Sequence, residues 1–79
     1  MPVTVRYFAR MAEITGCAQE TLSPVPVTAA ALFAELSQRH EFGFGIELIR
    51  VAVNDRLVNW QIELRDGDDV ALIPPVSGG

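Results

Sequence analysis

One helical pattern stands among several short strand patterns, and this order restricts the folds that the chain can adopt. Residues 28–40 carry apolar side chains at three- and four-residue spacing, and Thr28 is a typical helix N-cap. The flanking segments are short, rich in β-branched or apolar residues and often alternating, which is typical of strands. The predicted strands cover residues 3–8, 19–22, 49–53, 57–58 and 69–73. We therefore expect one helix across one face of a mixed sheet of four or five strands.

The order of these elements favours a particular member of the α+β class. The first and last strands are expected to be neighbours in the middle of the sheet, and the right-handed crossover rule then favours a β-grasp arrangement. Residues 9–14 are expected to form one helical turn that ends before Gly16. Residues 41–45 are expected to be a loop, and residues 60–64 a turn or a short helix.

The length of the chain predicts a single small domain. A chain of 79 residues buries about 60% of its unfolded surface, which leaves little room for a built-in catalytic cleft. Hydrophobic residues make up 49% of the chain and charged residues 20%, proportions that are typical of a globular protein and exclude a disordered one. We expect residues 1–75 to form the domain and residues 76–79 to form a flexible tail.

Charge and hydropathy indicate which kinds of partner the chain can bind. The net charge is −4 and all six basic residues are arginines, so the basic patch that nucleic-acid binding needs is not expected. An acidic surface instead fits a protein partner with a basic face. No apolar stretch approaches the ~20 residues of a membrane span, and the first residues lack the pattern of a signal peptide. We therefore expect no membrane contact and a cytoplasmic location.

The C-terminal segment is the most unusual part of the sequence. Pro74 and Pro75 lack backbone donors, so they end the last strand and keep the chain that follows extended. The tail then consists of Val76, Ser77, Gly78 and Gly79. These four residues reach about 13 Å when extended, and two bare glycines can pass an opening where a Cβ would clash. A frayed end explains the same tail equally well.

Strand alternation leaves apolar side chains on the sheet face that the helix does not cover. Phe8, Ala71 and Ile73 fall on this face, and Leu57 is expected near them. A contiguous apolar patch on an acidic protein indicates a partner surface.

No constellation of catalytic or metal-binding side chains is expected. The sole histidine, His40, lies at a predicted helix end, where a capping or exposed position explains it. Asp66, Asp68 and Asp69 lack the spacing of a calcium loop and suit a turn instead. Cys17 has no nearby basic residue to activate it, and a single cysteine cannot hold a metal cluster. The remaining group with useful chemistry is the terminal carboxylate of Gly79, which another enzyme would have to activate.

Several segments together match one known family. They are VRYFA at residues 5–9, Glu13 followed by Gly16, AVN at residues 52–54, DGDDVA at residues 66–71 and PPVSGG at residues 74–79. In these segments and in length the chain resembles the small, sulfur-carrying subunits of molybdopterin synthase, which belong to the ubiquitin-like β-grasp superfamily.

The resemblance implies a function for the tail. In this family an activating enzyme related to the ubiquitin-activating type adenylates the position of Gly79 with ATP, and a sulfur donor protein converts the adenylate to a thiocarboxylate. The tail, matching Pro74, Pro75, Val76, Ser77 and Gly78, inserts into the large subunit. The sulfur there attacks cyclic pyranopterin monophosphate to build the dithiolene of molybdopterin. The large subunit supplies the catalytic residues, so the resemblance implies a carrier that binds no cofactor and is not an enzyme on its own.

The resemblance also implies how the partner binds. The docking surface of the family falls on positions that match Phe8, Leu57 and Ile73, and the two kinds of subunit form a heterotetramer. Two other functions fit the fold. One is a sulfur carrier for thiamine or cysteine synthesis, although the diproline and the AVN segment point away from it. The other is a ubiquitin-like binding module that carries no sulfur and would tolerate deletion of Gly79.

Overall fold

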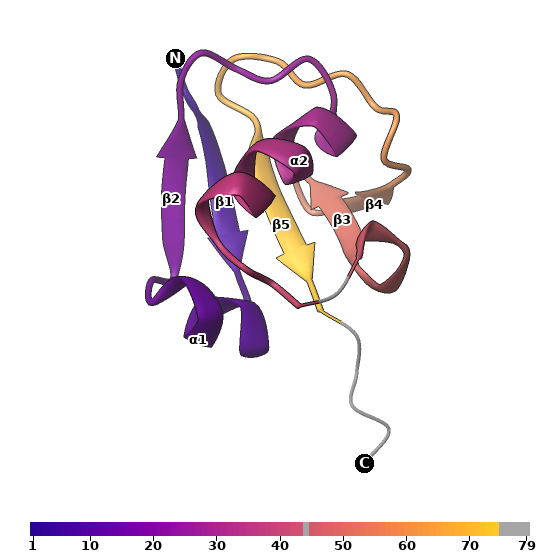
Figure 1. Cartoon of the computed structure of the whole chain (residues 1–79). Coiled ribbons are helices and arrows are strands. Elements are labelled where there is room, and N and C mark those ends of the chain that lie inside the picture. The colour runs from indigo at the N-terminus through magenta and orange to yellow at the C-terminus, as the bar shows by residue number, and fades with distance from the viewer. Residues whose placement is uncertain (44, 75–79) are drawn as a thin grey trace.

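A mixed sheet with one main helix across one of its faces makes up the computed structural model, which describes residues 1–43 and 45–74 (Figure 1). The strands are β1 (Val3–Tyr7), β2 (Gln19–Leu22), β3 (Arg50–Val53), β4 (Arg56–Val58) and β5 (Asp69–Ile73), and the helices are α1 (Arg10–Thr15), α2 (Ala29–Arg39) and the short 3₁₀ helix η1 (Ile46–Leu48). The expected domain boundary after residue 75 and the tail of residues 76–79 lie outside the described residues.

The strand order is β2-β1-β5-β3-β4, with β5 in the centre. Strand β1 runs parallel to β5, and the other neighbouring pairs are antiparallel. The first and last strands are therefore adjacent in the middle of the sheet, which confirms the predicted β-grasp arrangement. Because β1 and β5 are parallel, the residues that follow both strands lie at the same end of the sheet.

Helix α2 forms where the sequence places it, because its N-terminus is capped and one of its faces is apolar. The hydroxyl of Thr28 accepts a hydrogen bond from the backbone N–H of Ala31 at 3.1 Å. The buried residues of the helix are Ala29, Leu32, Phe33 and Leu36. They pack with the fully buried strand residues Val3, Val5, Val51, Val70 and Leu72 to form the core.

Residues 60–64 form a turn and an isolated bridge, which is one of the two predicted alternatives. Their carbonyl groups satisfy the first backbone donors of α2: Ala29 N–H donates to Ile62 at 3.1 Å and Ala30 N–H to Trp60 at 2.9 Å. Glu63 forms a bridge with Thr28. These contacts tie the segment to the start of α2, because helix N-termini leave donors that need partners.

The loop before β3 differs from the sequence prediction in one respect. The described residues 41–43 and 45 form the expected loop, but the 3₁₀ helix η1 follows it and was not predicted. Phe42 is buried and stacks on Phe33, with ring centroids 5.4 Å apart, so it closes the edge of the core. Phe44 lies outside the described residues. In the described part of the chain, no helix has the length and apolar character needed to cross a membrane.

Candidate protein-interaction site

A row of side chains crosses the sheet face that α2 leaves open. The strand register pairs Ala71 of β5 with Arg6 of β1 on one side and with Ala52 of β3 on the other, and Ala52 pairs with Leu57 of β4. Paired residues point to the same side of a sheet, so these side chains share one face. The buried Val70 and Leu72 flank Ala71 in the strand and point to the helix, which confirms that Ala71 faces outward.

Two large apolar residues extend this row toward the end of the sheet where the described chain ends. Phe8 follows β1 and is 46% exposed, and Ile73, at the end of β5, is half-buried. Leu57, which is in the row itself at the other side of the sheet, is 70% exposed. We define the docking patch as Phe8, Ala52, Leu57, Ala71 and Ile73. The outward orientation of the four predicted members agrees with the structure, and their role in binding stays a prediction.

Sequence reasoning missed Ala52, although the signal was present. Strand alternation places Ile49, Val51 and Val53 inward and therefore places Ala52 outward. A side chain as small as that of alanine does not by itself indicate a binding surface. Ala52 is only 8% exposed, because it lies in a central strand between larger neighbours. Ala52 and Ala71 lie side by side, and their small side chains form a shallow surface between the larger side chains of Phe8 and Leu57.

Charged and polar groups border the patch at the opposite end of β5. The guanidinium of Arg6 lies 2.7 Å from the carboxylate of Asp69. Asn54 accepts a hydrogen bond from Asp69 N–H at 3.0 Å and donates to Asp68 at 3.0 Å, so it joins two turns. Asn54 has a φ of 52°, a conformation that asparagine tolerates better than most residues.

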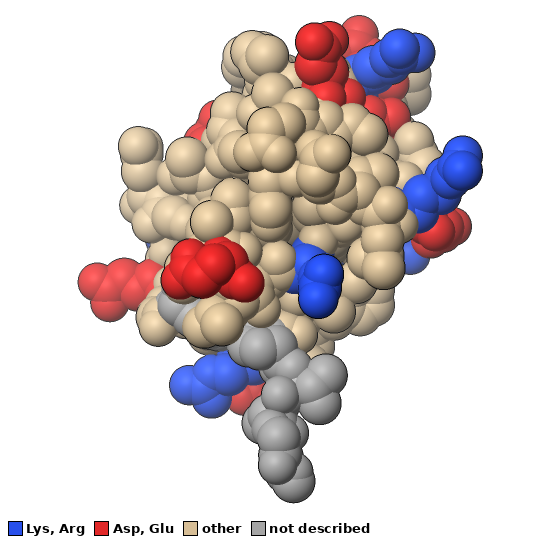
Figure 2. Space-filling view, turned by 90° about the vertical axis from the view of Figure 1, so that its right-hand side faces the viewer, with Lys and Arg blue, Asp and Glu red and all other residues tan. Residues whose placement is uncertain are grey.

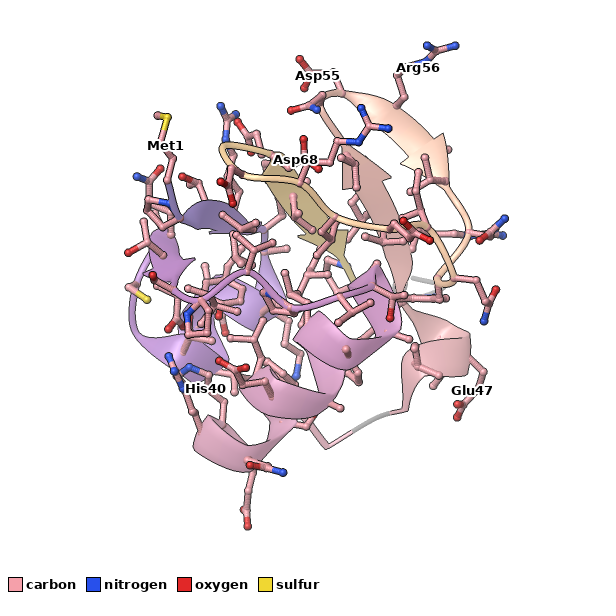
Figure 3. All side chains as sticks on the ribbon, turned by 90° about the horizontal axis from the view of Figure 1, so that it is seen from above. Met1, His40, Glu47, Asp55, Arg56 and Asp68 are labelled. Carbon is pink, nitrogen blue, oxygen red and sulfur yellow. The ribbon has the colours of Figure 1, made fainter. Side chains whose placement is uncertain are left out.

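The acidic cluster forms a turn, as predicted. Asp68 accepts a hydrogen bond from the backbone N–H of Arg65 at 2.8 Å, and Gly67 takes the positive φ of 81° that the turn requires. Among the described residues, no three acidic, histidine or cysteine side chains are grouped to hold a metal ion. Figure 3 shows Asp55, Arg56 and Asp68 in the upper part of the view, away from His40 at the lower left and Glu47 at the lower right.

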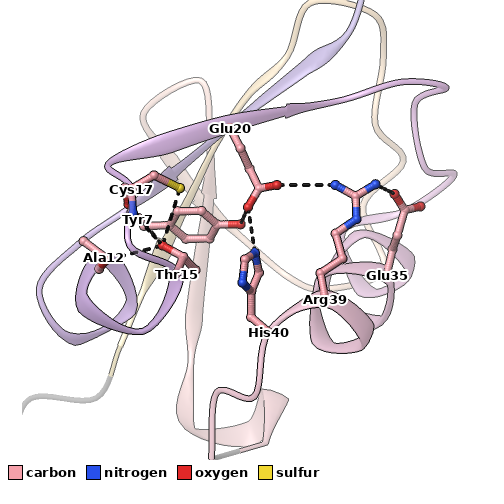
Figure 4. Close-up of polar contacts among 8 residues, drawn as sticks. All are labelled: Tyr7, Ala12, Thr15, Cys17, Glu20, Glu35, Arg39 and His40. Atoms are coloured by element: carbon pink, nitrogen blue, oxygen red, sulfur yellow. Dashed lines mark hydrogen bonds and ion pairs between the residues drawn. The ribbon is translucent and has the colours of Figure 1, made fainter.

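His40 belongs to a polar network on the helix side of the sheet (Figure 4). It is the C-cap of α2, as its predicted position at the helix end requires, and its Nε2 lies 2.9 Å from Glu20 Oε2. The hydroxyl of Tyr7 donates to the same carboxylate. Burial, together with this hydrogen bond to Glu20, raises the pKa of Tyr7 far above its usual range. The network fixes the end of α2 on the sheet and lies on the face opposite the docking patch.

Cys17 has a structural environment. Its side chain is half-buried, and its Sγ lies 3.7 Å from the hydroxyl of Thr15.

The root of the tail adjoins the docking patch. Strand β5 ends at Ile73, and the half-buried Pro74 follows it as the last described residue. Phe8 follows β1, which is parallel to β5, so Phe8 and Ile73 lie at the same end of the sheet. The other predicted tail residues, Pro75, Val76, Ser77, Gly78 and Gly79, lie outside the described residues. On the side of the molecule drawn in Figure 2, uncharged groups cover most of the surface and charged groups lie mainly around its rim.

Comparisons with known proteins identify one family that this chain resembles. The profile of the ThiS family matches residues 5–79. A human protein named molybdopterin synthase sulfur carrier subunit is 38% identical, in an alignment that covers 98% of this chain and 93% of the human protein. A putative subunit 1 of a molybdopterin converting factor from Pyrococcus furiosus is 35% identical, with a TM-score of 0.81 and coverage of 96% and 99%. A complex of subunits 1 and 2 of the molybdopterin-converting factor from Helicobacter pylori contains a chain that is 30% identical, with a TM-score of 0.70 and full coverage of both chains.

Proposed function

This chain belongs to the ThiS family and, through its near full-length relatives, to the sulfur carrier subunits of molybdopterin synthase, and we propose that it delivers sulfur to that synthase. The observation that carries this proposal is the similarity over almost the whole chain, including the C-terminal segment. The apolar docking patch at the root of the tail supports it, because a carrier must bind the enzyme that receives its terminus.

The proposed chemistry takes place at Gly79. Its carboxylate attacks the α-phosphate of ATP in an activating enzyme, which forms an acyl adenylate and releases pyrophosphate. A sulfur donor protein then supplies sulfur, AMP leaves, and the terminus becomes a thiocarboxylate. In the synthase this sulfur attacks cyclic pyranopterin monophosphate, and water then cleaves the resulting thioester, which leaves the sulfur on the pterin and restores the carboxylate of Gly79. Two such transfers build the dithiolene. Pro74, Pro75, Val76, Ser77 and Gly78 form the stem that brings the sulfur to the substrate.

The proposed division of labour leaves this chain without catalytic side chains of its own. The large subunit supplies the acid–base groups, and the two kinds of subunit assemble as a heterotetramer through the docking patch. ATP is a substrate of the activating enzyme, and we propose no bound cofactor for the carrier. We propose a cytoplasmic location for the protein.

A reconstituted synthesis tests this function. The chain, charged by its activating enzyme and a sulfur source, is mixed with the large subunit and the pyranopterin precursor, and the molybdopterin formed is measured. The full chain is expected to support synthesis. The Gly79-deleted chain is expected to form none, while its circular dichroism and melting temperature stay unchanged, because the tail contributes nothing to the core.

Two results would contradict the proposal in different ways. A normal yield from the Gly79-deleted chain would exclude a carrier and leave a ubiquitin-like binding module. A charged full-length chain that forms no molybdopterin, but supplies sulfur to thiamine or cysteine synthesis, would move the protein to another pathway.

A further inference from the structure

Arg50 lies at the root of the tail, next to the docking patch. Its partner across the strands is Ile73, so both side chains point to the open face of the sheet. Ile73 is the last residue of β5, and only Pro74 follows it in the described part of the chain. The side chain of Arg50 is exposed, whereas the residue after it, Val51, is buried in the core.

The charge of Arg50 has no partner among the described residues. Arg6 is paired with Asp69 at 2.7 Å, and Arg39 lies 3.3 Å from both Glu20 and Glu35. No described carboxylate lies within ion-pair distance of Arg50.

The acidic residue nearest to Arg50 in the sequence is directed elsewhere. Glu47 lies three residues earlier, in η1, and its carboxylate lies against the backbone of Gly45, where an added Cβ would meet both oxygens at 2.5 Å. Arg50 and Glu47 border the same shallow groove, together with Ile46 and Trp60, but they form no ion pair. The guanidinium of Arg50 is therefore available to a partner protein.

A partner that covers the docking patch would remove water from Arg50 as well. Ile73 and Arg50 are neighbours across the strands, so a surface that closes over Ile73 reaches the guanidinium. A buried charge without a partner is costly, and an interface that is retained must therefore supply an anion at this point. We propose that Arg50 forms an ion pair with a carboxylate of the large synthase subunit, at the mouth of the opening that receives the tail.

The length of the tail shows why this anion belongs to the partner and not to the reacting terminus. Gly79 is the sixth residue after Ile73, and six residues span about 20 Å when extended. A phosphate or sulfur at Gly79 would then lie beyond the reach of an arginine side chain that starts beside Ile73. The planar guanidinium suits a carboxylate, which it can bind through two parallel hydrogen bonds. This inference rests on the proposed function and adds a specificity-determining contact to it.

A binding titration with the large subunit tests the contact. Arg50→Ala is expected to raise the Kd about tenfold at low salt, and Arg50→Lys to raise it less, because lysine keeps the charge and loses the planar fork. The control is Arg56→Ala, which removes the same charge from an exposed residue. Arg56 neighbours Leu57 in β4, so it points to the other side of the sheet and should change the Kd less than about twofold. Circular dichroism melts of all variants check that they fold.

The salt dependence separates an ion pair from a packing effect. The ratio between the Kd of Arg50→Ala and that of the natural chain is expected to shrink as salt is raised, because added ions screen the attraction between Arg50 and the approaching carboxylate before the interface closes. An unchanged Kd, a ratio that does not respond to salt, or equal effects of Arg50→Ala and Arg56→Ala would overturn the inference. If the natural chain itself fails to bind the large subunit, the proposed function fails and this contact fails with it.

Discussion

Glu20 is the acceptor that joins three elements on the helix side of the sheet. Its carboxylate, on β2, takes hydrogen bonds from Tyr7 on β1 and from His40 at the end of α2, and Arg39 lies 3.3 Å away. Burial acts to raise the pKa of Glu20, but the hydrogen bonds from Tyr7 and His40 and the charges of His40 and Arg39 together outweigh it. The net effect lowers the pKa of Glu20 below its ordinary value.

This lowered pKa predicts a defined pH dependence of stability. A carboxylic acid whose pKa is lower in the folded than in the unfolded state stabilises the fold at any pH above its pKa in the unfolded state. This contribution to the free energy of unfolding is lost as the pH falls through the pKa of the folded state. Glu20→Gln is therefore expected to reduce the free energy of unfolding by about 1–3 kcal/mol at neutral pH, because a charged hydrogen-bond acceptor is lost. The difference from the natural chain should shrink as the pH falls below the ordinary pKa range of a glutamate, as urea unfolding at several pH values would show.

Glu35→Gln is the matched control for Glu20→Gln. Glu35 also lies 3.3 Å from Arg39, but this pair is on the surface of α2, and surface pairs contribute little. Its unfolding free energy should follow that of the natural chain at every pH. A constant difference between Glu20→Gln and the natural chain from neutral to acid pH would contradict the assigned role of Glu20.

The open face of the sheet is the element on which partner binding depends in this account. Phe8→Asp and Ile73→Asp each place a carboxylate in the docking patch, where covering it without a partner is costly. Each is expected to weaken binding to the large subunit by about 10- to 100-fold in a titration. The melting temperature should change little for Phe8→Asp, because that side chain is 46% exposed.

Leu48→Asp provides the control for a charge added at an exposed apolar position. Leu48 is 52% exposed, in η1, and is not a member of the docking patch. Its binding should be close to that of the natural chain. If Leu48→Asp weakens binding as much as Phe8→Asp does, or if neither patch variant weakens it, the interface lies elsewhere.

Local patterns in the sequence predict most of the elements and most of the patch. Alternation places Phe8, Ala71 and Ile73 outward, and β5 has the predicted bounds because a turn precedes it and Pro74 follows it. Two features depend on contacts between distant segments, which no local pattern reports. The shape of residues 60–64 is set by hydrogen bonds to the first turn of α2, and Glu20 meets a histidine 20 positions away.

In the molecule as a whole, the contacts that stabilise the fold and the docking patch lie on opposite sides of the sheet. On one side of the sheet α2 covers the core, and a series of rings from Tyr7 through His40, Phe42 and Phe33 to Trp60 closes it. The other side keeps the docking patch. The central strand β5 carries two members of that patch and continues directly into Pro74 (Figure 1). A partner that binds the patch therefore also fixes the point from which the tail departs.

The intact mass of the protein, co-expressed with its activating enzyme and a sulfur source, shows whether Gly79 carries sulfur. A sulfur carrier is expected to gain the difference in mass between sulfur and oxygen, located by fragmentation at Gly79. Oxidation of a methionine or of Cys17 adds nearly the same mass, so the C-terminal fragment must carry the change, and the Gly79-deleted chain must lack it. An unmodified terminus, with an activating enzyme shown to be active, would contradict a sulfur carrier.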